Sequence, residues 1–300
     1  MTARPLFGCG TALVTPFDPD GSIDEASLRA LVEWQISEGI HFLVPCGSTG
    51  EAQTMSLAEQ RRVVSITVEV AAGRVPVVAG ASSSDTRRAI EQSLEMQKAG
   101  ATHLLHSSPA YNKPPQRGIV RHFKAIAEAV DLPIVAYNVP GRTASNMTAD
   151  TTLALADVPN IVAIKEASGD LSQVERILRD RPPGFGVLSG DDALALPLMV
   201  MGGDGVISVV SNVTPRVMVM LVEAAASGDY ETARAMHELL GPWMDAAFVE
   251  SNPIPAKAAL TMVRRIQNVL RLPLVPLAAE HTPTVRAALV AAGVLEERDE

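Results

Sequence analysis

The sequence predicts a TIM barrel, an α/β fold of eight parallel strands and eight helices, followed by a helical extension. Short apolar runs that end in Gly, Ser, Pro or Asn recur about every 20 to 35 residues, with amphipathic segments between them. The runs show little alternation, which is typical of parallel strands covered on both faces. Their number, eight, favours a closed barrel. An open doubly wound sheet is the alternative, but no G-x-G-x-x-G motif follows the first run.

The strand–helix units follow one another along the chain. Several helical patterns end in Gly, which suits the left-handed conformation of a helix cap. The strands are expected within residues 10–17, 41–51, 75–82, 102–111, 133–143, 160–170, 186–192 and 204–212. The clearest helical patterns between them cover residues 25–39, 57–73, 85–100 and 118–130.

A region without strand patterns follows the eighth unit. It carries three helical patterns, at residues 230–249, 253–270 and 282–295. The stretch "SNPIPAK" indicates a helix start, with Asn252 as the cap and Pro253 at the first helical position. We therefore expect a catalytic barrel domain over residues 1–227 and a C-terminal helical domain over residues 228–300.

Composition narrows the classes of function. The net charge of −9, without a run of Lys or Arg, argues against a nucleic-acid surface. Cys9 and Cys46 form neither a disulfide framework nor a metal-binding spacing, and they suit a reducing cytoplasm. The N-terminal stretch lacks a continuous apolar run and a clear cleavage site, so we expect no signal peptide. No apolar run reaches the roughly 18 residues that span a bilayer, so we expect no membrane segment.

The most informative residue is the lysine of "NIVAIKEASGD". Alternate strand residues point inward in a barrel, so Ile161, Ala163 and Lys165 share one face. If that face is interior, Lys165 lies at the carboxyl end of the sixth strand, where active sites of this fold are found. Burial would lower the pKa of its ammonium group, and a neutral amine attacks a carbonyl carbon to form a Schiff base. The alternative is a solvated lysine, or one paired with a carboxylate.

Other strand ends support a functional interpretation. The loop Gly47–Gly50 offers backbone N–H groups and hydroxyls that can hold a small carboxylate, although a tight turn would explain it too. Tyr137 is a candidate proton relay and Arg142 a candidate carboxylate ligand. Their alternatives are a core tyrosine and a solvated arginine. Tyr111, in a Pro-rich loop, would by itself suggest a surface or interface residue.

Other chemistries find less support. His103 and His106 lie three positions apart on a strand and face opposite sides, which disfavours a shared metal ion. Asp191 and Asp192 are expected to cap the following helix rather than bind a cation. The glycines within residues 202–205 are expected to allow close backbone packing, because no Lys or Arg accompanies them for phosphate binding. The sequence therefore predicts no metal site.

Together these motifs resemble the dihydrodipicolinate synthase / N-acetylneuraminate lyase family of class I pyruvate aldolases. "GSTGE", "YNVP" and "IKEASGD" carry the resemblance, which runs from "GTALVTPF" to the "NPIPAK" region. "PGRT" and "NPIPAK" look like the synthase branch, which condenses pyruvate with aspartate semialdehyde in lysine biosynthesis. The resemblance implies no metal and no organic cofactor, and it implies a homotetramer built from two tight dimers.

The resemblance also implies catalytic roles. Lys165 would form the imine with pyruvate, and Tyr137 would transfer protons. Ser48, where the family usually has threonine, would link Tyr137 to Tyr111 in a proton relay. A serine keeps the hydroxyl group but lacks the methyl group that restricts its rotamer. Tyr111 would reach across the dimer interface into the site of the partner.

Substrate contacts follow from the same resemblance. Thr49 and Gly50, with Ser48, would hold the pyruvate carboxylate, and Ile207 would line the pyruvate pocket. Arg142 would bind the carboxylate of the semialdehyde.

The resemblance bears on regulation too. Some synthases of the family are inhibited by lysine at the dimer interface, where a histidine, a glutamate and a tyrosine are common. Here the matching positions carry Leu57, Arg88 and Ala110. Arg88 would repel the lysine ammonium group, so we expect insensitivity to lysine.

Two other functions stay open at this point. Another pyruvate-dependent aldolase or hydratase-aldolase would act on a sugar acid or an aromatic aldehyde, and Arg142 argues for a short carboxylated aldehyde instead. A non-catalytic barrel that binds a keto acid as a sensor is the third alternative.

Overall fold

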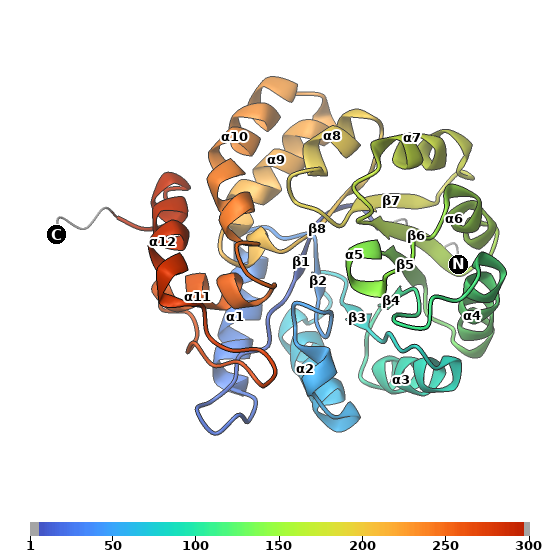
Figure 1. Cartoon of the computed structure of the whole chain (residues 1–300), viewed down its shortest axis with the longest axis horizontal. Helices are drawn as coiled ribbons and strands as arrows, with labels where there is room; N and C mark the ends of the chain where they lie inside the picture. The colour runs from blue at the N-terminus through green and yellow to red at the C-terminus, as the bar shows by residue number, and fades with distance from the viewer. Residues whose placement is uncertain (1–5, 297–300) are drawn as a thin grey trace.

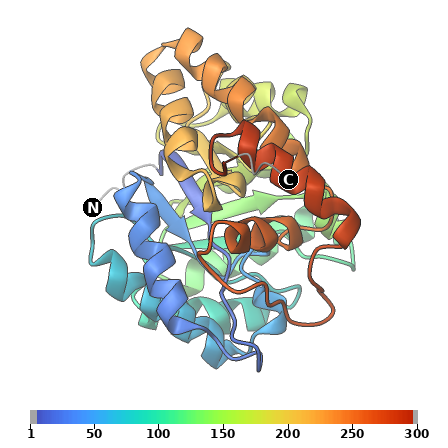
Figure 2. The same ribbon diagram turned by 90° about the vertical axis from the view of Figure 1, so that its left-hand side faces the viewer.

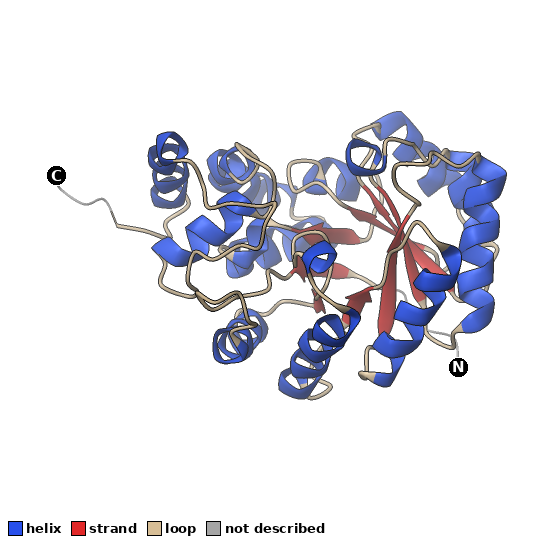
Figure 3. Ribbon diagram, turned by 60° about the horizontal axis from the view of Figure 1, so that its bottom comes forward, coloured by secondary structure: helices blue, strands red, loops and turns tan. Residues whose placement is uncertain are grey.

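Eight parallel strands form the centre of the molecule (Figures 1 and 3). The structure is a computed structural model and describes residues 6–296. Its sheet has the order β2-β1-β8-β7-β6-β5-β4-β3. Every predicted strand region contains or overlaps one of them: β1 Gly8–Ala12, β2 Phe42–Val44, β3 Val78–Gly80, β4 His103–Ser107, β5 Ile134–Asn138, β6 Ile161–Glu166, β7 Gly186–Ser189 and β8 Gly205–Ser208.

Contacts between β2 and β3 close the sheet. Leu43 forms an isolated parallel bridge with Val77. The backbone N–H of Leu43 donates to the Pro76 carbonyl at 3.0 Å, and that of Gly80 donates to the Pro45 carbonyl at 2.9 Å. The predicted TIM barrel with a C-terminal helical extension is therefore confirmed.

Helices surround the barrel, and local sequence signals fix several of their starts. Asp24 and Asp85 accept backbone N–H groups as N-caps of the helices Glu25–Ser37 and Thr86–Lys98. Ser56 with Glu59 forms a capping box for the helix Leu57–Ala71. The helices of the barrel are α1 Glu25–Ser37, α2 Leu57–Ala71, α3 Thr86–Lys98, α4 Gln116–Ala129, α5 Pro140–Thr143, α6 Ala149–Ala156, α7 Leu171–Asp180, α8 Ala195–Val200 and α9 Pro215–Ser227. Short 3₁₀ turns occur at Ala52–Thr54, Val210–Asn212 and Ala279–His281.

Two layers of apolar side chains stabilise this arrangement. The larger one lies between strands and helices, and a smaller cluster fills the barrel interior with residues such as Phe42, Val135 and Leu188. Glycines permit the closest approaches. A Cβ on Gly205 would lie 2.0 Å from the Gly8 carbonyl oxygen, so the prediction of close backbone packing there is confirmed.

The pairing of β5 with β6 corrects one detail of the predicted inward face. Ile134 pairs with Ile161, but the next residue, Val135, pairs with Ala163. Val162 is therefore an extra residue, as in a β-bulge. Ile161 packs in the outer layer, whereas Ala163 packs in the interior, so the expectation that these two share a face was wrong.

Three helices of the C-terminal region, α10 Tyr230–Ala246, α11 Ile254–Met262 and α12 Thr282–Ala291, pack beside the barrel (Figure 2). The buried Trp243 of α10 donates from Nε1 to the Val210 carbonyl at 3.2 Å, just beyond β8. No helix within residues 6–296 is both long enough and apolar enough to cross a membrane.

Two predicted helix caps were wrong. Helix α11 begins at Ile254 with Pro253 at the N-cap position, and the Asn252 side chain instead contacts Thr49. Asp192 does not cap α8, whose N-cap is Leu194. A local sequence pattern could not reveal the hydrogen-bond partners of Asn252 and Asp192, because those partners lie in other segments of the chain.

The Asp192 carboxylate has a different use. It is buried and accepts the backbone N–H groups of Val209 and Val210 at 3.0 and 3.2 Å, which fixes the chain after β8. Asp191 accepts the N–H of Ala193 at 3.0 Å and lines the cavity described below.

Candidate active site

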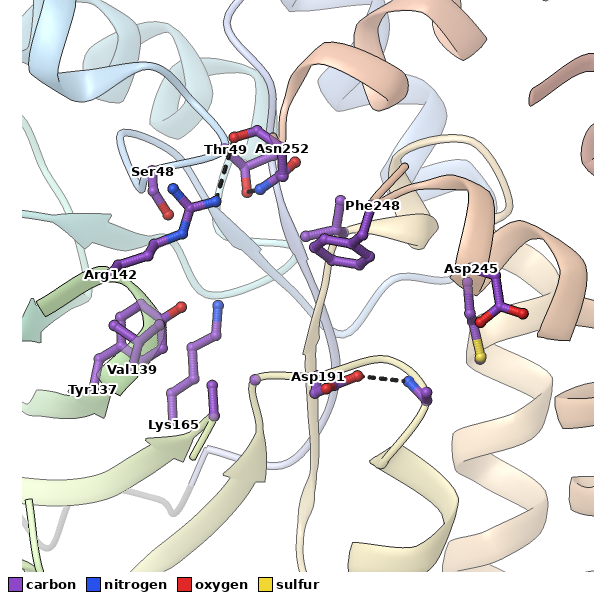
Figure 4. A pocket seen from close by; sticks show the side chains of 15 residues that line it. Ser48, Thr49, Tyr137, Val139, Arg142, Lys165, Asp191, Asp245, Phe248 and Asn252 are labelled. Carbon is purple, nitrogen blue, oxygen red and sulfur yellow. Dashed lines mark hydrogen bonds between the residues drawn. The ribbon is translucent and has the colours of Figure 1, made fainter. Parts of the chain in front are cut away.

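A cavity of about 450 Å³ lies at the carboxyl ends of the strands, where active sites of this fold are expected (Figure 4). It combines residues at or just after the ends of β2, β5, β6, β7 and β8 with residues from α10 and the segment after it. Its lining comprises Ser48, Thr49, Tyr137, Val139, Arg142, Lys165, Ala167, Gly190, Asp191, Ala193, Val209, Met244, Asp245, Phe248 and Asn252.

Lys165 lies near the end of β6 and is 5% exposed. Burial lowers its pKa to about 8; the Asp192 carboxylate opposes this shift and the Arg142 guanidinium adds to it. Its Nζ atom lies 4.4 Å from the centroid of the Tyr137 ring, the residue with which Lys165 pairs across β5 and β6. The amine is thus held in a mostly dry site beside a phenol.

Gly190 leaves room for the side chain of Lys165. The sequence did not indicate a role for this glycine. A Cβ at Gly190 would lie 3.0 Å from Cε of Lys165 and 2.7 Å from Cβ of Ala167. Any larger residue would therefore press on the lysine side chain. The "SGDD" motif contains this glycine, but only the three-dimensional contact reveals its purpose.

Tyr137 and Arg142, from β5 and the segment after it, form another part of the cavity wall. Burial raises the pKa of the Tyr137 hydroxyl to about 12, although Arg142 opposes that shift. Arg142 lies on the short helix α5. Its Nη2 donates to the backbone carbonyl of Asn252 at 3.3 Å. The phenol therefore stays protonated at neutral pH, and the guanidinium is held over the cavity.

The loop Gly47–Gly50 is a tight turn that faces the cavity. Gly50 donates to the Gly47 carbonyl at 3.1 Å, and Thr15 donates to the Gly50 carbonyl at 2.7 Å. Ser48 and Thr49 line the cavity as a result, whereas Gly50 does not. A Cβ at Gly50 would lie 3.0 Å from the Leu13 carbonyl oxygen, so the glycine serves the shape of the loop.

Two further predicted site residues lie outside this cavity. Tyr111 is 94% exposed, and its backbone N–H donates to the Thr143 carbonyl at 3.4 Å. Ile207 is fully buried in the interior cluster of the barrel. The structure of one chain thus gathers Ser48, Thr49, Tyr137, Arg142 and Lys165 around one cavity, and it places Gly50, Tyr111 and Ile207 elsewhere.

A second cavity, of about 550 Å³, adjoins the first and shares Ser48, Tyr137, Val139 and Arg142 with it. Arg88 and Ala110 line it, and Leu57 does not.

His103 and His106, the two histidines of β4, have separate contacts. The ring of His106 is buried and contacts the Ser93 hydroxyl at 3.1 Å, while His103 contacts Thr102 at 3.0 Å. Within residues 6–296, no group of three or more His, Cys, Asp or Glu side chains is arranged to hold a metal ion.

Comparison with known proteins gives one consistent result. The sequence model of the Dihydrodipicolinate synthetase family matches residues 5–292. A 4-hydroxy-tetrahydrodipicolinate synthase of Koribacter versatilis is 53% identical over 292 residues, which is 97% of each chain. The synthase of Chlorobium limicola is 46% identical and covers 98% of this chain and 100% of its own.

Solved structures agree with these matches. The dihydrodipicolinate synthase of Aquifex aeolicus superimposes with a TM-score of 0.94 at 38% identity, covering 96% of this chain and 99% of its own. The chloride-inhibited dihydrodipicolinate synthase of Acinetobacter baumannii, complexed with pyruvate, superimposes with a TM-score of 0.95 at 42% identity and the same coverage.

Proposed function

This chain belongs to the dihydrodipicolinate synthetase family, and from that premise we propose that it is a 4-hydroxy-tetrahydrodipicolinate synthase. It condenses pyruvate with aspartate semialdehyde through a Schiff base on Lys165. The single observation that carries the proposal is the setting of this amine, which is buried beside Tyr137 in a cavity that also presents Arg142.

The lowered pKa of Lys165 makes it a usable nucleophile. With a pKa of about 8, roughly one tenth of the molecules carry a neutral amine at pH 7. An ordinary lysine would be neutral in only about one molecule in 3,000. The neutral Nζ attacks the keto carbon of pyruvate, the C–O bond breaks, and water leaves as the protonated imine forms.

The imine then acts as an electron sink. A methyl proton leaves, the electron pair of that C–H bond forms an enamine, and the enamine carbon attacks the aldehyde carbon. The amino group of the condensed semialdehyde then attacks the imine carbon, so that the bond to Lys165 breaks and the ring closes. Tyr137, which stays protonated because its pKa is about 12, donates and recovers protons at these steps.

The two substrates carry two carboxylates, and separate groups bind them. Ser48 and Thr49, in the loop closed by Gly50, bind the carboxylate of pyruvate. Arg142 binds that of the semialdehyde, because a guanidinium can hold a carboxylate with two parallel hydrogen bonds. Ile207 supports the pocket from the interior cluster.

The assembly completes the site. We assign to Tyr111 a contact in the site of a second copy, where Ser48 would relay protons between it and Tyr137. The 94% exposure of Tyr111 in one chain supports this assignment. The homotetramer, the domain division at residues 227 and 228, and a cytoplasmic location are parts of the same proposal. The buried free thiols of Cys9 and Cys46 support the location.

A substrate panel tests the function. Pyruvate is offered with aspartate semialdehyde and, separately, with sugar-derived and aromatic aldehydes, and product formation is measured. We expect kcat/KM to be highest for the semialdehyde. Turnover of another aldehyde alone would point to a different pyruvate aldolase, and pyruvate binding without any turnover would point to a keto-acid sensor.

A further inference from the structure

We propose that Asn252 is a positioning residue that directs the hydroxyl proton of Thr49 toward the carboxylate of bound pyruvate. Asn252 belongs to the segment between α10 and α11, outside the loop that holds Thr49. The inference rests on the proposed function, because it concerns how one of the two substrates is held.

The contact between the two residues is direct. Asn252 lines the cavity and is only 6% exposed. Its Nδ2 donates to Oγ1 of Thr49 at 2.9 Å, in a buried hydrogen bond that joins residues 203 positions apart in the chain. Thr49 is 3% exposed and lines the same cavity. Figure 4 shows Thr49, Asn252 and Arg142 together at one side of the cavity.

The direction of this bond decides what the hydroxyl can do. A threonine hydroxyl has one proton to donate and two lone pairs that accept. Because Asn252 occupies a lone pair of Oγ1, the proton points elsewhere. In the part of the chain that the structure describes, Thr49 Oγ1 donates to no protein acceptor. The proton is therefore available to an anion in the cavity.

A second contact joins the loop of Thr49 to the C-terminal region. Glu51, two residues after Thr49, forms a buried ion pair with Lys257 of α11. The other oxygen of Glu51 accepts the backbone N–H of Arg271 at 3.1 Å. The loop that carries Thr49 is thus joined both to Asn252 and to the helix α11 that follows it.

The amide is chemically suited to this task. An aspartate has nearly the same shape, but its carboxylate only accepts hydrogen bonds. At position 252 it would take the Thr49 proton for itself and place a negative charge near the pyruvate carboxylate. The contact to Arg142 uses the backbone carbonyl of Asn252, so a substitution of the side chain leaves it in place.

Two substitutions at this position test the proposal. Asn252→Ala removes the donor, and Asn252→Asp reverses its polarity in nearly the same shape. We expect the KM for pyruvate to rise about fivefold in Asn252→Ala and more in Asn252→Asp, because the loss is that of one well-formed hydrogen bond. The KM for the aldehyde should change less than about twofold.

A double-mutant cycle separates positioning from packing. Thr49→Val removes the hydroxyl and keeps the shape, so Asn252→Ala should have little further effect on pyruvate binding in that background. A purely structural role predicts the same loss in both backgrounds. Asn160→Asp is the matched control, because Asn160 bonds two carbonyls at the opposite end of β6. Its pyruvate KM should stay unchanged.

The outcomes are distinguishable. In one outcome the unmodified protein binds pyruvate covalently, while Asn252→Ala and Asn252→Asp show the same KM for pyruvate as the unmodified protein. That result overturns the inference and leaves the proposed function standing. Equal losses with and without the Thr49 hydroxyl also overturn it. If the unmodified protein forms no imine at all, the proposed function fails first.

Discussion

At the scale of single residues, the proposed chemistry depends on how Lys165 is buried. Desolvation is the main cause of its lowered pKa, and Arg142 only adds to it. Gly190 leaves room for the side chain, and Tyr137 covers it from β5. The pKa of the amine is therefore lowered mainly by its buried position near the end of β6 rather than by a single charged partner.

The rate of imine formation should depend on pH accordingly. The pKa of Lys165 is lowered to about 8, so the neutral amine fraction rises about tenfold per pH unit below that value and levels off above it. We expect the rate at limiting pyruvate, measured by trapping with borohydride, to rise from pH 6 and to reach a plateau near pH 8 to 9. A plateau only above pH 10 would contradict the account.

Substitution of Arg142 should affect the two substrates differently. Arg142→Ala removes the proposed charged partner of the semialdehyde carboxylate, so the KM for the semialdehyde is expected to rise by more than about tenfold. Pyruvate imine formation should stay within about threefold, because we assign the pyruvate carboxylate to the loop of Ser48 and Thr49. Steady-state kinetics with trapping on the same samples checks both. Equal losses for the two substrates would contradict the assignment.

Lysine should not regulate the enzyme. Arg88 lines the second cavity and would repel the lysine ammonium group. We expect full activity in the presence of about 1 mM lysine, because lysine would bind the second cavity too weakly to occupy it at that concentration. The measurement is the initial rate over a lysine series, and half-inhibition below that concentration would refute the expectation.

Sequence reasoning found the part of the candidate site that lies at strand ends. Tyr137 and Lys165 directly follow apolar runs, and parallel strands bring such positions to one edge. Sequence patterns did not indicate the roles of Asn252 and Gly190, because these roles depend on contacts with other segments of the chain. The structure places five of the predicted residues around one cavity, namely Ser48, Thr49, Tyr137, Arg142 and Lys165.

At the scale of elements, a buried polar pair joins the ends of β5 and β6. Nδ2 of Asn138 donates to both carboxylate oxygens of Glu166 at 3.1 Å. Glu166 also accepts from the backbone N–H of Ser168 at 2.7 Å. Because Asn138 and Glu166 directly follow Tyr137 and Lys165, their hydrogen bonds help to fix the relative positions of the two candidate catalytic side chains.

Replacing the amide donor Asn138 by an acceptor should break this hydrogen bond, and exchanging donor and acceptor between the two positions should restore it. Asn138→Asp sets two carboxylates against each other, and we expect kcat to fall at least about tenfold with a loss of about 2 kcal/mol in the free energy of unfolding. Adding Glu166→Gln provides a new amide donor and should recover much of both losses. Kinetics and urea unfolding of the unmodified protein, the single variant and the double variant decide. A double variant no better than Asn138→Asp would contradict the pairing.

Element positions were largely predictable, but irregularities within them were not. Hydrophobic runs and Asp or Ser caps predict strands and helix starts such as those of α1 and α2. The extra residue Val162 left no signal, because a period-two pattern cannot show where pairing shifts by one residue. The start of α11 was misplaced because Asn252 forms its hydrogen bond across the molecule.

At the scale of the whole molecule, the C-terminal region completes the cavity. Met244, Asp245, Phe248 and Asn252 contribute part of the lining. The buried pair of Glu51 and Lys257 holds this region against the barrel. Nζ of Lys257 also donates to the Val269 carbonyl at 2.8 Å and lies 4.3 Å from the centroid of the Phe17 ring. Barrel and extension therefore act as one structure at the site.

Breaking the buried pair should be costly. Lys257→Met leaves the Glu51 carboxylate buried without its cation, and we expect about 3 to 5 kcal/mol of destabilisation in urea unfolding. Lys98→Met is the matched control, because Lys98 pairs with Glu95 at the surface, and it should cost less than about 1 kcal/mol. Similar losses in the two variants would argue against a structural role for the buried pair.

The fold as a whole was predictable from counting. Eight apolar runs with helical patterns between them permit few other arrangements, and the comparisons with solved structures agree. The packing of the C-terminal helices onto the strand ends was not predictable, since helical periodicity shows which face is buried but not against which element it lies.

The most direct test of the central claim is reductive trapping of Lys165. The protein is incubated with pyruvate and borohydride, digested, and its lysine-containing peptides are identified by mass spectrometry, with Lys165→Arg as the control. We expect one stoichiometric label, on Lys165, and none in the control. A protein that stays unlabelled, or that is labelled on a different lysine, would contradict the account.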